Sequence, residues 1–188
     1  MGYLSKVLAI CLAMLPLATS AQVITSVTPS DNLATIIQSA GPGTIVLLDP
    51  GDYGALELRG VSGSEAAPII LRSAVPADPA KLTGLNLREV NHLTLDGVNF
   101  DYTYQSTDTP SQRPFQIFTS RDIAIENSVF DGDEAPSAVG QPAYPTGFGL
   151  AVRSSAGIRI DHNEFRNFYR GMVINDVVDL QVRANDVH

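Results

Sequence analysis

The chain has 188 residues, of which 12 are Lys or Arg and 20 are Asp or Glu, so its formal net charge is −8. Nucleic-acid binders need a basic face to neutralise phosphates, and this acidic balance argues against that class. The length suffices for one domain with a hydrophobic core.

The first 21 residues have the pattern of a secretory signal peptide. Lys6 ends a short basic start, residues 7–17 are apolar, and "ATSA" supplies small residues for cleavage near Ala21. The apolar run is too short for a membrane span, so we expect none in the mature chain. The prediction is a signal peptide at 1–21, a domain at 22–188 and a secreted or periplasmic location. Cleavage also removes Cys11, the one cysteine, so the fold needs no disulfide.

A short amphipathic segment opens the domain. In "SDNLATIIQSAGPG" the apolar residues between 33 and 40 fall at helical spacing, and Gly41-Pro42 ends the pattern. We expect a helix here, with Ser30 or Asp31 as its N-cap, covering the N-terminal end of the core.

A repeat fills the rest of the chain. "GFGLAVRSSAGIRIDHNEF" returns as "RGMVINDVVDLQVRANDVH" 22 residues later, and the same pairs of alternating apolar residues can be followed back towards residue 85. Each unit contains three short strand patterns. A large apolar residue stands five positions after the second pair in every unit: Phe100, Phe130, Phe165 and Val187.

Units of this kind bury their inner faces by stacking, which predicts an all-β, right-handed parallel β-helix with about 22 residues per turn and strands about 4.8 Å apart. The phenylalanines should form one interior ladder. Residues 101–114 and 131–148 are insertions that should leave the solenoid at one corner. Asn163 and Asn185 should form a structural ladder at the sharp corner before the third strand, where asparagine tolerates the left-handed conformation. No second cap follows the last unit, so we expect the chain to be the N-terminal part of a longer protein.

The stretches "PGTIVLLDPGDYGALEL", "GSEAAPIILRS" and "KLTGLNLREVNHLTLDGVNF" resemble the opening of right-handed parallel β-helix proteins of the pectin-lyase-like superfamily. The pattern is most similar to the chondroitinase B and alginate lyase group of polysaccharide lyases. The resemblance implies sugar chains lying along the first strand of each turn, and a catalytic lysine and arginine with calcium nearby. After residue 21 the sole lysine is Lys81, which lies too early in the chain to match.

On the first strand of each turn, two columns of residues should face outward. They run Asn86, Gln116, Ala151, Val173 and Arg88, Phe118, Arg153, Asn175. Arginine grips carboxylates through two parallel hydrogen bonds, and a ring can stack on a sugar. The predicted substrate-binding residues are therefore Arg88, Gln116, Phe118, Arg153 and Asn175. The alternative is that these are ordinary exposed residues without a role in binding.

On the second strand the outward column is Asp96, Glu126, Asp161 and Arg183. Three carboxylates at rung spacing repel one another, so one should keep its proton or all three should share a cation. Calcium is the candidate metal for Asp96, Glu126 and Asp161. A glycoside hydrolase could also use carboxyls on adjacent rungs. The alternative is that the carboxylates splay into water and Arg183 neutralises Asp161.

These patterns predict an exported β-helix that binds an acidic polysaccharide and, in a full-length form, cleaves it by β-elimination. The alternatives are a non-catalytic secreted or cell-surface β-helix, such as an adhesin or a calcium-dependent scaffold, and a glycoside hydrolase. β-Elimination needs a base beside the uronate. Neither first-strand column contains a lysine, histidine or tyrosine, so this chain alone should have no lyase activity.

Overall fold

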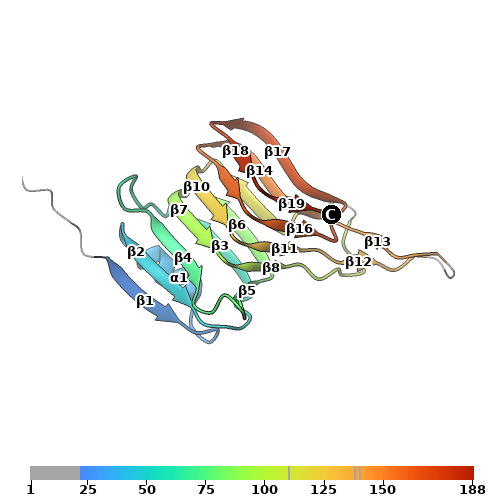
Figure 1. Cartoon of the computed structure of the whole chain (residues 1–188), viewed down its shortest axis with the longest axis horizontal. Coiled ribbons are helices and arrows are strands. Elements are labelled where there is room, and N and C mark those ends of the chain that lie inside the picture. Colours follow the sequence, from blue (N-terminus) through green and yellow to red (C-terminus); the bar gives the residue numbers. More distant parts are fainter. Residues whose placement is uncertain (1–21, 110, 138, 140) are drawn as a thin grey trace, which may run out of the picture.

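The computed structural model describes residues 22–109, 111–137, 139 and 141–188. The proposed signal peptide lies outside these residues and stays a prediction. The described chain is a right-handed parallel β-helix in which short strands stack along one axis (Figure 1). Within the described residues no helix is long and apolar enough to cross a membrane.

Each turn contributes up to three strands, and strands of successive turns pair in parallel to form three faces. The first face consists of β3 (Ala55–Arg59), β6 (Gly84–Arg88), β9 (Phe115–Phe118), β14 (Phe148–Ala156) and β17 (Arg170–Val178). The second face consists of β1 (Val23–Val27), β2 (Thr44–Leu48), β4 (Ile69–Ser73), β7 (Asn91–Asp96), β10 (Arg121–Glu126), β15 (Arg159–Asp161) and β18 (Gln181–Arg183). The third face consists of β5 (Lys81–Leu82), β8 (Asn99–Asp101), β11 (Val129–Asp131), β16 (Glu164–Arg166) and β19 (Asp186–Val187).

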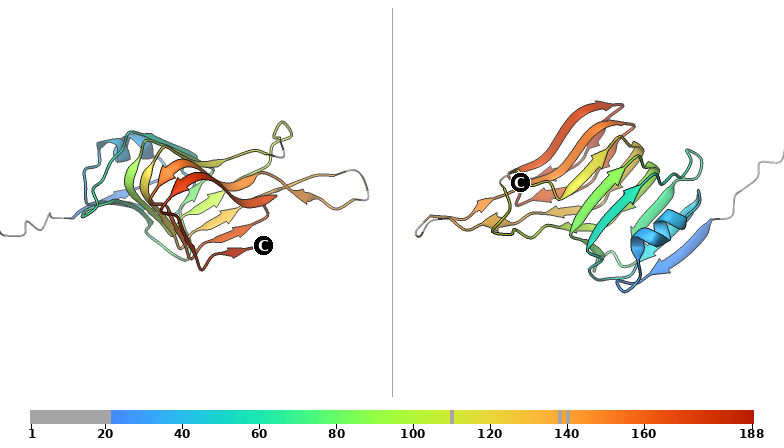
Figure 2. Two further views of the ribbon diagram at one scale, coloured as in Figure 1. Left: turned by 90° about the horizontal axis from the view of Figure 1, so that it is seen from above. Right: turned by 180° about the vertical axis from the view of Figure 1, so that it is seen from behind.

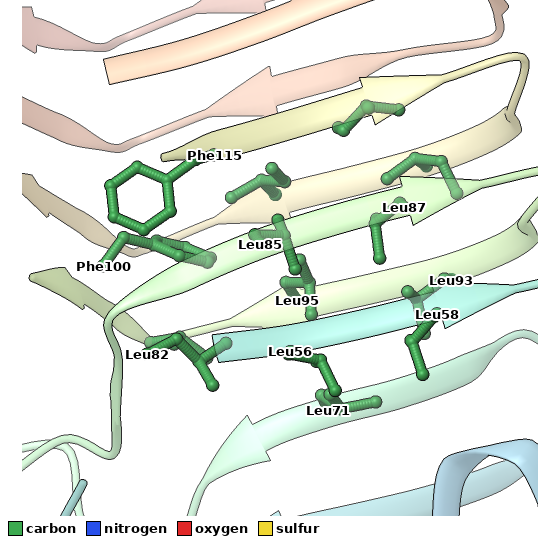
Figure 3. Packing of buried hydrophobic residues seen from close by; sticks show 14 of the residues in the cluster. Leu56, Leu58, Leu71, Leu82, Leu85, Leu87, Leu93, Leu95, Phe100 and Phe115 are labelled. Carbon is green, nitrogen blue, oxygen red and sulfur yellow. The ribbon is translucent and has the colours of Figure 1, made fainter. Parts of the chain in front are cut away.

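The interior is built from the alternating apolar residues of all three faces (Figure 3). The rings of Phe100 and Phe130 stack with centroids 4.3 Å apart, and those of Phe130 and Phe165 at 4.4 Å. All three side chains are buried, and Phe165 is in register with Val187 on the next rung. The predicted ladder and its register are confirmed, because a one-residue slip would have turned these rings to solvent.

The corners between strands are made by stacked residues in the left-handed conformation. At the corner between the second and third faces these are Asn127, His162 and Ala184, with φ of 53°, 53° and 48°. The prediction that Asn163 and Asn185 adopt this conformation is wrong. The left-handed residue comes one position earlier, which leaves each asparagine pointing inward at the start of the third strand.

The predicted asparagine ladder is confirmed, and hydrogen bonds between these inward side chains hold it together. Asn163 is 2 % exposed, and its Oδ1 accepts from the Ser128 backbone N–H at 3.0 Å. Its own backbone N–H donates to Asn185 Oδ1 at 2.9 Å, and its Nδ2 donates to the Ile125 carbonyl at 2.9 Å. Each side chain thus satisfies a backbone donor of the preceding rung, which removes the cost of burying it unpaired.

The helix α1 (Leu33–Ser39) lies at the N-terminal end of the solenoid (Figure 2). Leu33 and Ile37 are its buried residues, as the spacing predicted. The predicted N-cap is wrong: Asn32 caps the helix by accepting from the Thr35 backbone N–H at 3.0 Å. Asp31 instead accepts from the Thr28 backbone N–H at 2.8 Å, which holds the turn before the helix.

The two insertions leave the third face and return to the first. They begin after the paired strands β8 and β11 and end at the paired strands β9 and β14. The second insertion contains an antiparallel hairpin of β12 (Glu134–Ala135) and β13 (Tyr144–Pro145). Both project from the same side of the solenoid (Figure 2), so the prediction of a shared corner is confirmed.

Candidate functional site

The outer side of the first face carries the residues predicted to bind a substrate. Gln116 pairs with Ala151, while Arg88, Phe118, Arg153 and Asn175 occupy equivalent positions on β6, β9, β14 and β17. Along each strand, these outward residues alternate with residues that face the core, as the two-residue period of a β-strand requires. The structure therefore brings the five predicted residues together on one surface.

Arg88, Phe118 and Arg153 form a stack along the solenoid axis. The Cζ of Arg88 lies 5.1 Å from the centroid of the Phe118 ring, and the Cζ of Arg153 lies 5.4 Å from it. Because the arginines belong to rungs on opposite sides of β9, the ring stands between two guanidiniums. Its faces are not free to stack on a sugar, and its contribution is to orient the arginines through cation–π contacts.

Charge balance distinguishes these arginines from their neighbours. Arg59, one rung before Arg88, forms an ion pair with Glu89 at 3.1 Å. Arg88 donates to the amide oxygen of Asn86 at 3.3 Å. Within the described residues neither Arg88 nor Arg153 has a carboxylate within ion-pair distance. Both guanidiniums are therefore available to an anion from solution.

Two further arginines at the start of first-face strands were missed in the sequence: Arg113 stands just before β9, and Arg170 is the first residue of β17. The Cζ of Arg113 lies 5.2 Å from the centroid of the Phe148 ring, and the Cζ of Arg170 lies 5.5 Å from it. Arg170 also lies over Tyr169, at 5.6 Å. The signal that could have found them is that Phe148 and Arg170 occupy the same position of the repeat, immediately before Gly149 and Gly171.

The second face places Asp96, Glu126, Asp161 and Arg183 in register, as predicted. Asp96 and Glu126 each have an arginine partner of their own. Arg72 Nε donates to Asp96 Oδ2 at 2.6 Å, and Arg159 donates to Glu126 Oε2 at 2.6 Å. Among the described residues Asp161 has no ion pair with Arg183: its buried Oδ1 lies 3.1 Å from Nδ1 of the corner residue His162 but has no hydrogen-bond partner.

The described residues contain no group of three or more His, Cys, Asp or Glu side chains placed to hold one metal ion together. Asp96 also accepts from Asn127 Nδ2 at 2.9 Å, so both of its oxygens are engaged. A calcium ion shared by Asp96, Glu126 and Asp161 would have to displace the partners Arg72 and Arg159. The calcium site stays a prediction.

Two of the larger hollows lie on or beside the second face. One, of about 410 Å³ on the second face, contains His92, Asp122 and Arg159; His92 Nδ1 lies 3.5 Å from Asp122 Oδ2. The other, of about 430 Å³, is walled by the loop after β4 and contains the ion pair of Arg72 and Asp96. Both arginines are already paired, so neither hollow offers a free cation.

Charges on the third face are also matched. Arg166 donates to Asp131 at 2.7 Å and to Glu164 at 3.2 Å, and Lys81 donates to Asp101 at 3.0 Å. The hydrogen bond from Arg166 lowers the pKa of Asp131, and the same contact raises the pKa of Arg166. The third face is thus stabilised by its own ion pairs and presents no comparable free arginines.

Comparison with solved structures finds the same fold in two polysaccharide lyases. Pectate lyase Pel9A is similar with a TM-score of 0.51 and 14 % identity over 86 % of this chain and 55 % of that chain. A mannuronic-acid-specific family 6 polysaccharide lyase from human gut microbiota has a TM-score of 0.52 and 14 % identity over 88 % and 52 %. The chain therefore spans about half the length of these structures. No known family model and no curated protein matches the sequence.

Proposed function

We propose that this β-helix binds an acidic polysaccharide along its first face. The observation that carries the proposal is the stack of Arg88, Phe118 and Arg153, whose two exposed guanidiniums have no carboxylate partner among the described residues. In a chain of net charge −8, two unpaired arginines that stack on one ring form a local cluster of positive charge. The likeness to two polysaccharide lyases supports a saccharide as the partner.

The chemistry of the stack suits carboxylates on a sugar chain. A guanidinium presents a planar fork of donors that matches the two oxygens of a carboxylate. Phe118 holds both forks in place, so less side-chain freedom is lost when the ligand arrives. Gln116 and Asn175 add amide groups that can exchange hydrogen bonds with sugar hydroxyls. The small, buried side chain of the neighbouring Ala151 leaves a shallow depression that Gln116 and Asn175 also line.

Cleavage by β-elimination belongs to the proposal only for a longer form of the protein. The reaction needs a base at the sugar carbon beside the carboxylate and a cation at the carboxylate itself. The two outward columns of the first face supply the cation, through Arg88 and Arg153, but contain no lysine, histidine or tyrosine. That composition favours a second candidate, a non-catalytic polysaccharide-binding β-helix.

The proposed location is outside the cytoplasm, secreted or periplasmic, and rests on residues 1–21. An acidic polysaccharide of a cell surface or matrix is a partner that such a location makes accessible. Calcium is a proposed accessory ion at Asp96, Glu126 and Asp161, which calorimetric titration of the protein with calcium chloride would test.

The binding proposal is tested by calorimetry of the 188-residue chain with alginate, polygalacturonate and chondroitin, and with neutral dextran as the control polymer. We expect binding to at least one acidic polymer and none to dextran. The double variant Arg88→Gln/Arg153→Gln should abolish it, whereas the double variant Arg121→Gln/Arg183→Gln, an equal change of charge on the second face, should not. Equal losses in both variants would show a mere effect of net charge and contradict the proposal.

Activity is followed separately, through the ultraviolet absorbance of the unsaturated product. We expect no rise with any of the three acidic polymers, because the two outward columns of the first face contain no lysine, histidine or tyrosine to act as the base. A steady rise that Arg153→Gln abolishes would show that this chain carries a base and would decide against the non-catalytic candidate.

A further inference from the structure

The rung before the cationic stack carries a third arginine of the same outward column. Arg59 on β3 pairs with Arg88 on β6, which pairs with Phe118 on β9, and Phe118 pairs with Arg153 on β14. Exposed and buried residues alternate along β3, and Arg59 is one of the exposed ones. The column of arginines therefore continues one rung beyond the stack of Arg88, Phe118 and Arg153.

Arg59 differs from the other two arginines because a carboxylate occupies its guanidinium. Its Nε donates to Glu89 Oε2 at 3.3 Å, and its Nη2 donates to Glu89 Oε1 at 3.1 Å. The planar fork of the arginine thus holds both oxygens of the carboxylate, which is how a guanidinium would also grip a carboxylate of a ligand. An anion from solution would have to compete with Glu89 for the same donors.

Glu89 reaches Arg59 from the corner between the first and second faces. It follows Arg88 directly, at a corner position with a φ of 56°. The corner residues that stack at this place are Glu89, Thr119, Ser154 and Asp176. Within the described part of the chain, Glu89 is the one residue of these four that forms an ion pair. The composition of the corner therefore decides which arginine of the column is neutralised.

A second carboxylate stands on the same strand as Arg59. Glu57 lies two residues before Arg59 and pairs with Asn86, so it belongs to the other outward column of the first face. Glu57 is exposed and has no hydrogen bond or ion pair within the described residues. This end of the face thus sets two carboxylates, of Glu57 and Glu89, against the one guanidinium of Arg59.

We propose that Glu89, by masking Arg59, sets one end of the anion-binding site on the first face. The free guanidiniums begin at Arg88, and an acidic chain that continues past it towards β3 meets an occupied arginine and the carboxylate of Glu57. Glu89 thereby limits how many acidic groups of a ligand the face can engage at once. The inference rests on the proposed function, since it concerns the same face.

One substitution should remove the mask without disturbing the fold. The ion pair is open to solvent, with 72 % of the Arg59 side chain and 55 % of the Glu89 side chain exposed, and exposed pairs contribute little to stability. Glu89→Gln keeps the length of the side chain and leaves a neutral amide, which competes less well for the donors of Arg59. The column would then offer three guanidiniums, from β3 to β14, over about 14 Å at about 4.8 Å per rung.

The test is a double-mutant cycle, measured by calorimetric titration of the 188-residue chain with hexasaccharides of alginate, polygalacturonate and chondroitin. Glu89→Gln should strengthen binding by about tenfold, as one additional charge-assisted contact would give. Arg59→Gln should weaken binding far less than Arg88→Gln does, because its guanidinium is already occupied. The double variant Arg59→Gln/Glu89→Gln, which has the net charge of the native chain, should return to the native affinity.

Two further variants control for charge. Glu65→Gln removes an exposed carboxylate without an ion pair from the loop before β4 and should leave the affinity unchanged at physiological ionic strength, where charges more than about 8 Å apart are screened. Glu57→Gln should give a smaller gain than Glu89→Gln, because it removes a repulsion but releases no donor. Circular dichroism and the midpoint of urea unfolding of each variant would show that the fold is intact.

The failure of this inference differs from the failure of the proposed function. If Arg59→Gln weakens binding as much as Arg88→Gln, Arg59 already contacts the ligand and the inference is overturned. A gain from Glu89→Gln that persists in the double variant, or that Glu65→Gln reproduces, would show a general effect of charge and overturn it too. The absence of any gain would mean that Glu89 does not set the end of the site. If no acidic hexasaccharide binds, the proposed function and the inference fall together.

Discussion

On the third face Arg166 donates to Asp131 at 2.7 Å and to Glu164 at 3.2 Å, whereas on the first face Arg153 lies over the ring of Phe118 and has no carboxylate partner among the described residues. The two arginines stand on the same β-helix, on strands of one turn, β14 and β16. The packing of the core requires neither the ion pairs of Arg166 nor the ring contact of Arg153, because both side chains point away from the core. The difference therefore concerns what each face does: one set of charges stabilises the solenoid, and the other is free to bind.

The interior beneath both faces gives the largest expected effect. Phe130→Ala removes the middle ring of the ladder, which contacts Phe100 and Phe165 by stacking and Phe115 edge to face. Truncating a buried phenylalanine costs about 3–5 kcal/mol of the free energy of unfolding. Urea unfolding would measure the loss.

The matched control is Phe118→Ala, which removes an outward ring of the same repeat. Phe118 is partly exposed and contacts two arginines through cation–π interactions, each worth about 0.5–1 kcal/mol at exposed sites. We expect a small change in stability and a clear loss of polysaccharide affinity. If Phe118→Ala destabilised the chain as much as Phe130→Ala, the first face would be part of the scaffold and the comparison would break.

The arginines themselves should give opposite results in two measurements. Arg153→Gln should weaken acidic-polysaccharide binding by about tenfold, as loss of a charge-assisted contact predicts, and leave unfolding unchanged. Arg166→Gln should lower the free energy of unfolding by about 1 kcal/mol or less, because its ion pairs are partly exposed, and leave binding unchanged. Calorimetric titration and urea unfolding of both variants would decide. The same pattern of losses in both variants would contradict the division between the faces.

The register of the solenoid could be predicted from the sequence because burial leaves little choice. Phe100, Phe130 and Phe165 each follow an alternating apolar pair by the same number of residues, and a shift by one would expose them. The outward columns follow from the same alternation. This is why Arg88 and Arg153 were correctly placed side by side with Phe118, although no local feature of the sequence links them.

The corners and the charge partners could not be predicted in the same way. Backbone geometry, rather than the residue type, decides which corner position is left-handed: Glu89, Thr119 and Ala184 adopt positive φ there. Ion pairs between rungs depend on rotamers, so the partner of Asp161 was wrongly expected to be Arg183. Arg113 was missed because it lies in an insertion, where the repeat gives no register.

The smallest expected effect concerns acid. Arg166 holds the pKa of Asp131 below its ordinary value, chiefly by its hydrogen bond, with a further contribution from Asn167. A carboxyl whose folded pKa is lowered stabilises the protein above its unfolded pKa, about 3.9, and this contribution is lost as the pH falls through the folded pKa. The part of the stability that depends on Asp131 should therefore be present at neutral pH and disappear in stronger acid.

Arg166→Gln makes this dependence measurable. The difference in the free energy of unfolding between the native chain and the variant should be a few tenths of a kcal/mol to about 1 kcal/mol at neutral pH, and should shrink as the pH falls below about 4. Arg153→Gln, which removes an arginine without a carboxylate partner, should show no such shrinkage. Urea unfolding of the three proteins at neutral and acid pH provides the comparison. A difference for Arg166→Gln that stays constant with pH would mean that its contribution comes from packing of its aliphatic stem rather than from Asp131, and the third face would then owe less to matched charge than its short hydrogen bonds indicate.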